Sequence, residues 1–167
     1  VQASSIEDYI SYLHRHPREV SALFKDLLIG VTKFFRDADS YEVLRQVVIP
    51  AIFRHAEKRK SKSIRGWVAG CSTGEEAYSI AMLLRDYMED HGVNIELKVF
   101  ATDIDKEAIE FAGIGLYPDS IAADLEVAFL SKYFEKKTGG YQVKRSVREM
   151  VVFALQNLIK DPPFTKV

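Results

Sequence analysis

Three short stretches hold residues whose types and spacing could bind a ligand. They are "GCSTGEE" at residues 70–76, "ATDID" at residues 101–105 and "ALQNLI" at residues 154–159, and each lies at the end of an apolar run typical of a buried strand. In a parallel sheet, ligands bind beyond the carboxyl ends of the strands, so the three stretches are expected to face one site. A loop with Gly70 and Gly74 lets a ligand approach the backbone closely. The carboxylate of Asp103 can accept hydrogen bonds from both hydroxyls of a ribose.

The same loop narrows the class of ligand. It matches neither the G-x-G-x-x-G pattern of dinucleotide sites nor the lysine-containing pattern of a P-loop. A ligand with a pyrophosphate is therefore disfavoured. A cofactor that has a ribose but no phosphate fits better, and S-adenosylmethionine is such a cofactor.

Each of these residues also has a purely structural interpretation. Thr73 and Glu76 have the spacing of a capping box, in which Glu76 would only bond the first turn of a helix. On local sequence alone, this interpretation is about as good as a ligand role for Glu76. Asp105 is expected to cap a helix rather than to bind a ligand, and Gly74 can mark nothing more than a turn.

The elements that position the three stretches follow from apolar periodicity. We expect strands at residues 64–70, 95–102 and 150–157, and helices at 75–89 and 106–112. Strand, helix, strand, helix in this order predicts a parallel sheet of the doubly wound type. The buried face of the first helix is expected to comprise Ala77, Ile80, Ala81, Leu84 and Met88. Residues 133–153 alternate in places and contain Gly139 and Gly140, which predicts a hairpin in a small antiparallel unit.

Before residue 63 the pattern is helical. One helix is expected to start after the capping residue Ser5, and a second to start at Pro17 and to end at Gly30. A third is expected over residues 40–60, where Pro50 should kink or divide it. Its inward side chains are predicted to be Leu44, Val47, Val48 and Ile52.

Composition excludes several classes of protein. The 23 basic residues nearly balance the 24 acidic ones, which argues against a nucleic-acid or membrane-surface binder. No apolar run reaches the roughly 20 residues that span a bilayer. Cys71 is the only cysteine, so neither a disulfide framework nor a cysteine metal cluster is expected. We expect a cytoplasmic protein without a metal site.

Four motifs in a fixed order carry a family resemblance. They are "GVTKFFRD" at residues 30–37, "WVAGCSTGEEAYSIAMLL" at 67–84, "ATDID" at 101–105 with "AGIGLY" at 112–117, and "QNLIKDPPF" at 156–164. Together they resemble the CheR family, the chemotaxis-receptor glutamate O-methyltransferases. The resemblance implies methyl transfer from S-adenosylmethionine to glutamate side chains on the cytoplasmic domains of chemoreceptors.

The resemblance also implies an α/β fold. A small all-α N-terminal domain, residues 1–37, would precede a Rossmann-like methyltransferase domain at residues 38–167. A small antiparallel β-subdomain would be inserted at about residues 116–150. The family pattern places Phe34 and Phe35 as packing residues between the helical unit and the sheet domain.

The family pattern carries over to individual site residues. It implies cofactor contacts at Thr32, Arg36, Gly70, Glu76, Asp103, Asn157 and Leu158. With the family in view, a ligand role for Glu76 leads over the capping role, although both can coexist. Arg36 is the residue expected to face the methyl-transfer site as a catalytic residue, where it would orient a carboxylate of either the acceptor or the cofactor.

The chemistry that the resemblance implies needs no general base. A free glutamate has a pKa of about 4.3, so it is already an anion at neutral pH. It can attack a sulfonium methyl directly and in line. Positioning and desolvation are then the tasks of the protein. The four histidines lie outside the motifs, and no role is expected for them.

The sequence departs from the family pattern in two places. Gly30 stands where many members have an asparagine that touches the cofactor, and a glycine there also suits a helix end. The chain stops at Val167, where the family continues into further strands, so we expect a C-terminally truncated domain with three core strands and an open sheet edge. Whether such a chain binds cofactor or is active stays open.

The hairpin loop and the alternatives complete these expectations. The loop "EKKTGGYQ" is short compared with family members that dock on a receptor's C-terminal pentapeptide, so no such tether is expected. One alternative is a non-catalytic, cofactor-binding regulatory module of a larger signalling protein. The other is a methyltransferase of the same fold that acts on a different acceptor.

Overall fold

The structure is a computed structural model that describes residues 5–27, 30 and 32–164. The chain divides into two compact units, residues 1–30 and residues 31–167. The boundary at residue 37 and the span 116–150 for the β-subdomain stay predictions. Every helix of the described residues is too short or too polar to cross a membrane.

The first unit consists of two amphipathic helices, α1 (Ile6–Arg15) and α2 (Pro17–Leu27). Ser5 caps α1, since its hydroxyl accepts a hydrogen bond from the backbone N–H of Asp8 at 3.1 Å. The predicted helix starts at Ser5 and Pro17 are thus confirmed. Residues 28 and 29 lie outside the described part, so the predicted end of the second helix at Gly30 does too. Large apolar side chains of this unit remain exposed, Leu27 by 70%.

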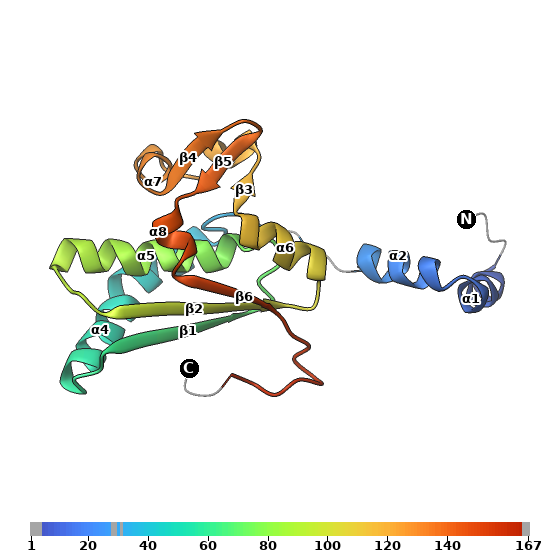
Figure 1. Cartoon of the computed structure of the whole chain (residues 1–167), viewed down its shortest axis with the longest axis horizontal. Coiled ribbons are helices and arrows are strands. Elements are labelled where there is room, and N and C mark those ends of the chain that lie inside the picture. Colours follow the sequence, from blue (N-terminus) through green and yellow to red (C-terminus); the bar gives the residue numbers. More distant parts are fainter. Residues whose placement is uncertain (1–4, 28–29, 31, 165–167) are drawn as a thin grey trace. The chain divides into compact units, whose positions relative to one another are not determined.

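The second unit is built on a three-stranded parallel sheet. Its strands are β1 (Ser63–Ala69), β2 (Glu96–Asp103) and β6 (Val151–Leu155), in the order β1-β2-β6. Two helices, α5 (Glu75–His91) and α6 (Lys106–Ile114), cover one face of this sheet (Figure 1). The predicted α/β class and the strand-helix alternation are confirmed.

The sheet register explains which side chains form the core. Gly66 of β1 lies beside Val99 of β2, which lies beside Val151 of β6. Because side chains alternate between the faces of a sheet, Val99 and Ala101 point to the same side, and both are fully buried. Of the predicted face of α5, Ala77, Ala81 and Leu84 are buried, and Ile80 and Met88 are partly buried against the core. The first half of α5 is buried on further sides, at Tyr78, Ser79, Met82 and Leu83.

The segment before β1 differs from the single helix expected there. It consists of α3 (Ala38–Val43), a π-helical turn η1 (Leu44–Val48) and α4 (Ile49–Lys58). Pro50 stands in the first turn of α4, just after the π-helical turn. The backbone at Val48 and Ile49 stays helical, so the segment is irregular here but is not divided at the proline.

The predicted inward face of this segment was largely wrong. Leu44 packs against the core, but the exposed fractions of Val47, Val48 and Ile52 are 59%, 39% and 38%. The buried residues are instead Ile49, Phe53 and Ala56. A π-helical turn accommodates one extra residue, which rotates everything after it by one position. The core therefore receives Ile49 in place of Val48 and Phe53 in place of Ile52.

A small antiparallel sheet forms the inserted subdomain. Its strands are β3 (Leu116–Tyr117), β4 (Phe134–Lys137) and β5 (Gly140–Val143), in the order β3-β5-β4. Around it lie η2 (Asp119–Ala123), α7 (Val127–Tyr133) and α8 (Arg145–Arg148). The predicted hairpin is confirmed: Lys137 pairs with Gly140 across a two-residue turn at 138–139.

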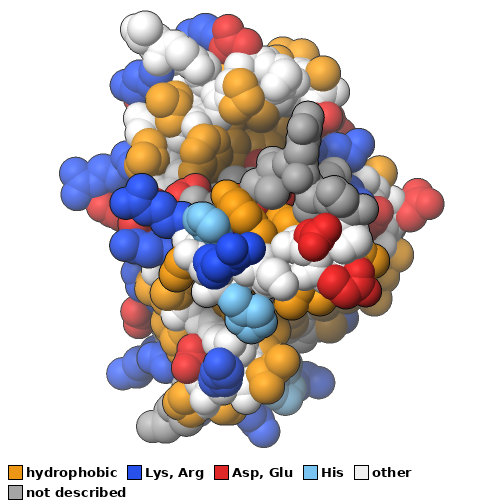
Figure 2. Space-filling model, turned by 90° about the vertical axis from the view of Figure 1, so that its right-hand side faces the viewer, with side chains coloured by type: hydrophobic (Ala, Val, Ile, Leu, Met, Phe, Trp, Pro, Cys, Tyr) orange, Lys and Arg blue, Asp and Glu red, His pale blue; other side chains and the backbone are white. Residues whose placement is uncertain are grey.

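Aromatic rings join this subdomain to the rest of the second unit. Phe34 is 1% exposed, and its ring lies edge-on to those of Tyr117 at 4.9 Å and Phe134 at 5.3 Å. Phe35 packs against Tyr41 at 5.1 Å and against Phe129 at 5.3 Å. Both phenylalanines thus have a packing role, but all four of these partners belong to the second unit, so packing between the helical unit and the sheet domain stays a prediction. On the face drawn in Figure 2, basic and acidic side chains both occur among apolar ones.

Candidate cofactor site

The carboxyl ends of the three parallel strands are joined by backbone hydrogen bonds. The N–H groups of Gly70 and Cys71, just after β1, both donate to the carbonyl oxygen of Thr102 in β2, at 2.8 and 2.9 Å. The N–H of Gln156, just after β6, donates to the carbonyl oxygen of Asp103 at 2.9 Å. The structure therefore brings the three stretches singled out in the sequence to one end of the sheet.

Asp103 lies at the centre of this arrangement. One carboxylate oxygen accepts from the N–H of Ser72 at 2.7 Å, and the other accepts from the N–H of Asp105 at 2.9 Å. Each carboxylate oxygen has two lone pairs, so both retain capacity for a further donor such as a ribose hydroxyl. Asp103 fixes the loop after β1 and still presents an acceptor to a ligand.

The two glycines of the loop have different tasks. Gly70 has φ +72°, and a Cβ added there would meet nothing within 4 Å. Gly74 has φ +94°, and a Cβ there would lie 2.8 Å from Cβ of Ala112 and 3.0 Å from the ring of Phe153. Gly70 therefore leaves open space beside the backbone, while Gly74 permits close packing of α5 on α6 and β6. Between them, Ser72 has φ +47°, a strained value for a residue with a side chain.

The predicted capping box is wrong. The residue that caps α5 is Gly74, in the left-handed conformation and without a side-chain bond, so the helix begins one residue later than a cap at Thr73 requires. The Thr73 hydroxyl instead donates to Glu75 at 2.7 Å, and the Thr73 carbonyl accepts from the Tyr117 hydroxyl at 2.7 Å. Glu76 is thus not engaged as a capping partner.

The two neighbouring glutamates of the loop have opposite surroundings. Glu75 is 9% exposed, and burial raises the pKa of its carboxyl, although the hydrogen bond from Thr73 opposes this. Glu76 is exposed in the same first turn, at the positive end of the helix dipole. Glu75 therefore belongs to the scaffold of the loop, and Glu76 is the carboxylate accessible to a ligand.

The segment that holds Thr32 and Arg36 is anchored through Phe34 and Phe35, which lie between them. Phe34 is buried against Tyr117, whose hydroxyl bonds Thr73 in the loop after β1. The N–H of Phe35 donates to the hydroxyl of Ser79 in α5 at 3.2 Å, and Phe35 has φ +49°. Two non-glycine residues with left-handed backbone thus flank the first turns of α5, and such strain occurs often at functional sites. Thr32 is half-buried and Arg36 is exposed.

Asn157 shapes the turn after β6. Its side-chain oxygen accepts from the N–H groups of Ile159 at 3.0 Å and Lys160 at 3.2 Å. Its backbone N–H donates to Asp161 and its carbonyl accepts from Lys160 and Asp161, so a ligand contact by Asn157 would use its amide NH₂. Leu158 is 57% exposed, so its side chain is accessible.

Three residues that shape this site received no individual role from the sequence, although Glu75 and Gln156 lie in the stretches singled out there. Gln156 is 7% exposed, and its Oε1 has no hydrogen-bond partner among the described residues, which leaves a buried acceptor at the site. Tyr117 and Glu75 fix the backbone at Thr73. The motif "AGIGLY" contained Tyr117, but its partner at residue 73 is distant in sequence and could not be inferred from it.

Cys71 is a packing residue. It is 2% exposed. Burial, and then the charge of Asp103, raise the pKa of its thiol to about 12. A thiol in this state is not a nucleophile at neutral pH. Within the part of the chain that the structure describes, no three His, Cys, Asp or Glu residues gather to hold a metal.

The residues at this end of the sheet fit an adenosyl cofactor without phosphates. The open backbone at Gly70, the spare acceptor capacity of Asp103 and the unpaired acceptor of Gln156 suit a sugar and a base with hydroxyl and amino donors. Residues 70–76 contain no lysine or arginine for a pyrophosphate.

Known proteins agree with this assignment. A family model described as "CheR methyltransferase, SAM binding domain" matches residues 30–167. A chemotaxis protein methyltransferase of Borreliella burgdorferi is 32% identical over 95% of this chain and 58% of its own length. The chemotaxis protein methyltransferase of Escherichia coli is 33% identical over 95% of this chain and 55% of its own length.

A longer relative is more similar in sequence. It is an uncharacterized 104.1 kDa protein of Rhodobacter capsulatus, 41% identical over 99% of this chain, which corresponds to 17% of that protein. The chain thus spans little more than half the length of the two chemotaxis methyltransferases, and a small part of the Rhodobacter protein. The match over residues 30–167, with S-adenosylmethionine as the cofactor, shows that this chain belongs to the CheR methyltransferase family.

Proposed function

We propose that the protein methylates glutamate side chains on the cytoplasmic domains of chemoreceptors, with S-adenosylmethionine as the methyl donor. The observation that carries this proposal is the convergence of residues 70–76, Asp103 and Gln156 at one end of the sheet, in a chain of this family. The names of the Borreliella and Escherichia relatives support a chemotaxis substrate.

The site residues divide the work between binding and orientation. The bound cofactor supplies an electrophilic methyl group on a sulfonium sulfur. Asp103 accepts from the ribose, and Glu76 faces the cationic part of the cofactor, with Thr32, Gly70, Asn157 and Leu158 lining the remainder. Arg36 orients the acceptor carboxylate, which is ionised at neutral pH because a free glutamate has a pKa of about 4.3. Methyl transfer then needs no general base from the protein.

The setting of this activity is part of the proposal. The protein acts in the cytoplasm on the receptor's cytoplasmic helices, without binding nucleic acid and without a pentapeptide tether. The short turn at residues 138–139 between β4 and β5 supports the last point, because it offers little loop surface to a docked peptide. Specific binding of a receptor-tail pentapeptide to the purified protein would contradict it.

The central test is a radiolabelled methyl-transfer assay with receptor-containing membranes, paired with calorimetric titration of S-adenosylhomocysteine. We expect base-labile label on receptor glutamates together with binding of S-adenosylhomocysteine. Binding without base-labile label would reject glutamate methylation and leave the cofactor site standing. Absence of both would reject the proposal altogether.

Arg36 offers a sharper test of the chemistry. Replacing Arg36 with Ala should reduce methyl transfer about 100-fold, because misplaced reacting groups lose this much, while the melting temperature stays unchanged. Arg54→Ala, at an exposed position of α4, serves as the matched control and should keep full activity. A folded Arg36→Ala variant with near wild-type turnover would remove Arg36 from the site.

A second candidate function has one observation in its favour. The Rhodobacter relative matches this chain over only 17% of its length, so this domain also occurs within a much larger protein. In that setting the domain could bind S-adenosylmethionine as a non-catalytic regulatory module, or methylate another acceptor. The assay above separates these alternatives, since a regulatory module binds without turnover and another acceptor leaves receptor glutamates unlabelled.

A further inference from the structure

A cavity of about 260 Å³ lies in the second unit, lined by none of the residues assigned to the cofactor. Its walls come from α3, η1, α5 and the segment from η2 to α7, with the buried side chain of Leu83 contributing from α5. Small-molecule sites usually measure about 300–1,000 Å³, so this cavity has the size of a single long side chain rather than of a cofactor.

Three aromatic rings form the apolar part of the cavity. They belong to Phe35, Tyr41 and Phe129, and all three side chains are only partly buried. The ring of Phe35 lies 5.1 Å from that of Tyr41 and 5.3 Å from that of Phe129, edge to face in both pairs. The rings thus support one another in a fixed arrangement, and the negative faces of such rings attract cations.

The charged residues of the cavity have an excess of negative charge. Glu42, Asp124 and Glu126 contribute carboxylates, all of them exposed. Glu42 accepts from the amide of Gln46, whereas no ion pair involves Asp124 or Glu126 among the residues that the structure describes. The cavity therefore offers carboxylates at its rim that lack a cationic partner within the described structure.

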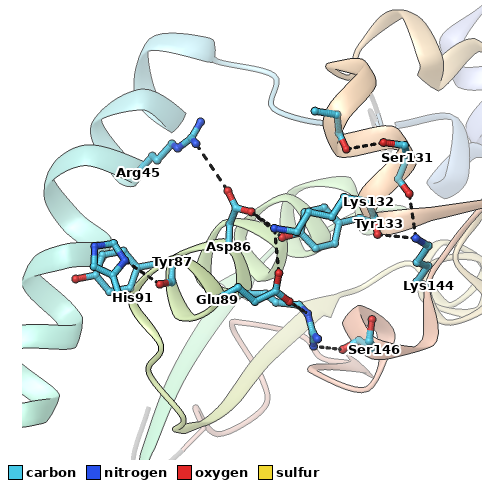
Figure 3. A network of polar contacts seen from close by, with 12 residues as sticks. Arg45, Asp86, Tyr87, Glu89, His91, Ser131, Lys132, Tyr133, Lys144 and Ser146 are labelled. Atoms are coloured by element: carbon cyan, nitrogen blue, oxygen red, sulfur yellow. Dashed lines mark hydrogen bonds and ion pairs between the residues drawn. The ribbon is translucent and has the colours of Figure 1, made fainter.

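Arg45 is the single basic residue lining the cavity, and its guanidinium is held elsewhere. Figure 3 shows Arg45 directed at Asp86 of α5, with a separation of 3.7 Å between the charged atoms. Asp86 also contacts Lys132 at 2.5 Å, so this part of the surface is already supplied with positive charge. Among the described residues, no ion pair joins Arg45 to Asp124 or Glu126.

We propose that this cavity receives an arginine side chain of a protein partner. A guanidinium is planar and stacks on aromatic faces, and its five N–H donors match carboxylates. An apolar side chain of a partner would leave the carboxylates at the rim without a hydrogen-bond donor, and an acidic side chain of a partner would be repelled by them. Charge complementarity and volume together favour a single basic side chain. The inference does not depend on methyl transfer, and the partner can be the methylated protein or another protein.

The test is a nuclear magnetic resonance titration of the ¹⁵N-labelled protein with Nα-acetyl-L-arginine N-methylamide. We expect shift changes concentrated at Phe35, Tyr41, Leu83 and Phe129. The matching citrulline compound has the same shape without the charge, and it should bind at least about threefold more weakly, as expected for loss of one exposed ion pair. Absence of localised shifts, or equal shifts with the citrulline compound, would overturn the proposal.

Variants separate the cavity from general electrostatics. Asp124→Asn and Glu126→Gln should each weaken binding of the arginine compound about threefold, and Phe129→Leu should weaken it to a similar extent by removing a ring face. Asp90→Asn removes an exposed carboxylate of α5 that does not line the cavity, and it should leave binding unchanged. An equal loss in Asp90→Asn would show that only the net charge matters and would reject the site.

Discussion

The loop after β1 and the helix α7 are attached to the second unit by different kinds of contact. The loop is fixed by backbone N–H groups, which bond the carbonyl of Thr102 and the carboxylate of Asp103. Helix α7 is attached to α5 by charged side chains, with Asp86 contacting Lys132 at 2.5 Å and the Tyr133 hydroxyl at 3.0 Å (Figure 3). Lys132 also pairs with Glu89 at 3.0 Å.

The shape of the loop after β1 is thus set by backbone hydrogen bonds, whereas the contact between α7 and α5 is set by charged side chains. The hydrogen bonds from the loop to the carbonyl of Thr102 do not titrate, and salt affects them little. Exposed ion pairs are screened by salt and are lost when a partner changes its protonation. We therefore expect the loop at residues 70–76, called the cofactor loop below, to keep its shape under conditions that weaken the contact between α7 and α5. The loop after β1 and the antiparallel sheet that follows α7 both contain glycines, and replacing these glycines measures how tightly each backbone is packed.

The largest effect is expected at Gly140 in the antiparallel sheet. A Cβ added there would lie 1.8 Å from the carbonyl oxygen of Tyr117, so the backbone itself would have to move. Gly140→Ala should lower the free energy of unfolding by about 3–5 kcal/mol, as the most severe single substitutions do. Gly139 also has a left-handed φ but meets nothing within 4 Å, and Gly139→Ala should cost only about 1 kcal/mol. Denaturant unfolding measures both, and equal losses would contradict the steric account.

A smaller effect of the same kind is expected in the cofactor loop. Gly74→Ala adds a Cβ 2.8 Å from that of Ala112 and should cost about 2–3 kcal/mol. Gly70→Ala meets open space and should cost about 1 kcal/mol for its left-handed φ. The order should reverse for cofactor binding, because Gly70 leaves the space beside the loop backbone. Calorimetry with S-adenosylhomocysteine decides this, and a Gly70→Ala variant that binds normally would place the ligand elsewhere.

The parallel sheet and its helices could be predicted because each depends on local pattern. Apolar runs and Asp105 mark where β2 ends and α6 begins, and the Asp105 carboxylate accepts from the N–H groups of Glu107 and Ala108 as a cap should. The spacing of Gly139 and Gly140 likewise predicted the hairpin. The convergence of the three stretches at one edge followed from the general geometry of parallel sheets.

The features that could not be predicted depend on contacts between residues far apart in the sequence, or on a one-residue shift in the helical periodicity. The π-helical turn at Leu44–Val48 shifts the buried face by one residue, and no side chain in the sequence marks it. Helix α5 starts at Glu75 as predicted, but the left-handed Gly74 caps it in place of Thr73, so no capping box forms. Glu75 is buried and bonded to Thr73, whereas Glu76 is exposed. The sequence shows only two adjacent glutamates, so it cannot reveal this difference.

Removing the charge at Asp86 tests the attachment of α7 directly. Asp86→Ala leaves Lys132 and the Tyr133 hydroxyl without this acceptor and should cost about 1–2 kcal/mol of unfolding free energy. Asp90→Ala, at an exposed position on the same helix, should stay within about 0.5 kcal/mol of the wild type. Binding of S-adenosylhomocysteine should be unchanged in both. A loss of binding in Asp86→Ala would mean that the loop and α7 are coupled.

The smallest effect on stability is expected from a change of pH. Its direction follows from the ionisation of Glu89 and Lys132. The hydrogen bond from Lys132 lowers the pKa of Glu89 in the folded protein. The stability that Glu89 contributes is therefore present above the pKa of the unfolded chain, about 4.3, and is lost as pH falls through the lowered pKa of the folded state. The hydrogen bond to Asp86 raises the pKa of Lys132, so its contribution is complete below about 10.4 and is lost as pH rises through the raised value. The contact should be at full strength between about pH 5 and pH 10.

Thermal unfolding of wild type and Lys132→Met across this range measures that contribution. The difference in melting temperature should be greatest between about pH 5 and pH 10, and it should shrink on both sides and in high salt. Lys106→Met removes a more exposed ion pair, to Glu110 on α6, and should give a small difference throughout. A Lys132→Met difference that stays constant with pH and salt would assign the attachment of α7 to packing, and the contrast with the backbone-held loop would then disappear.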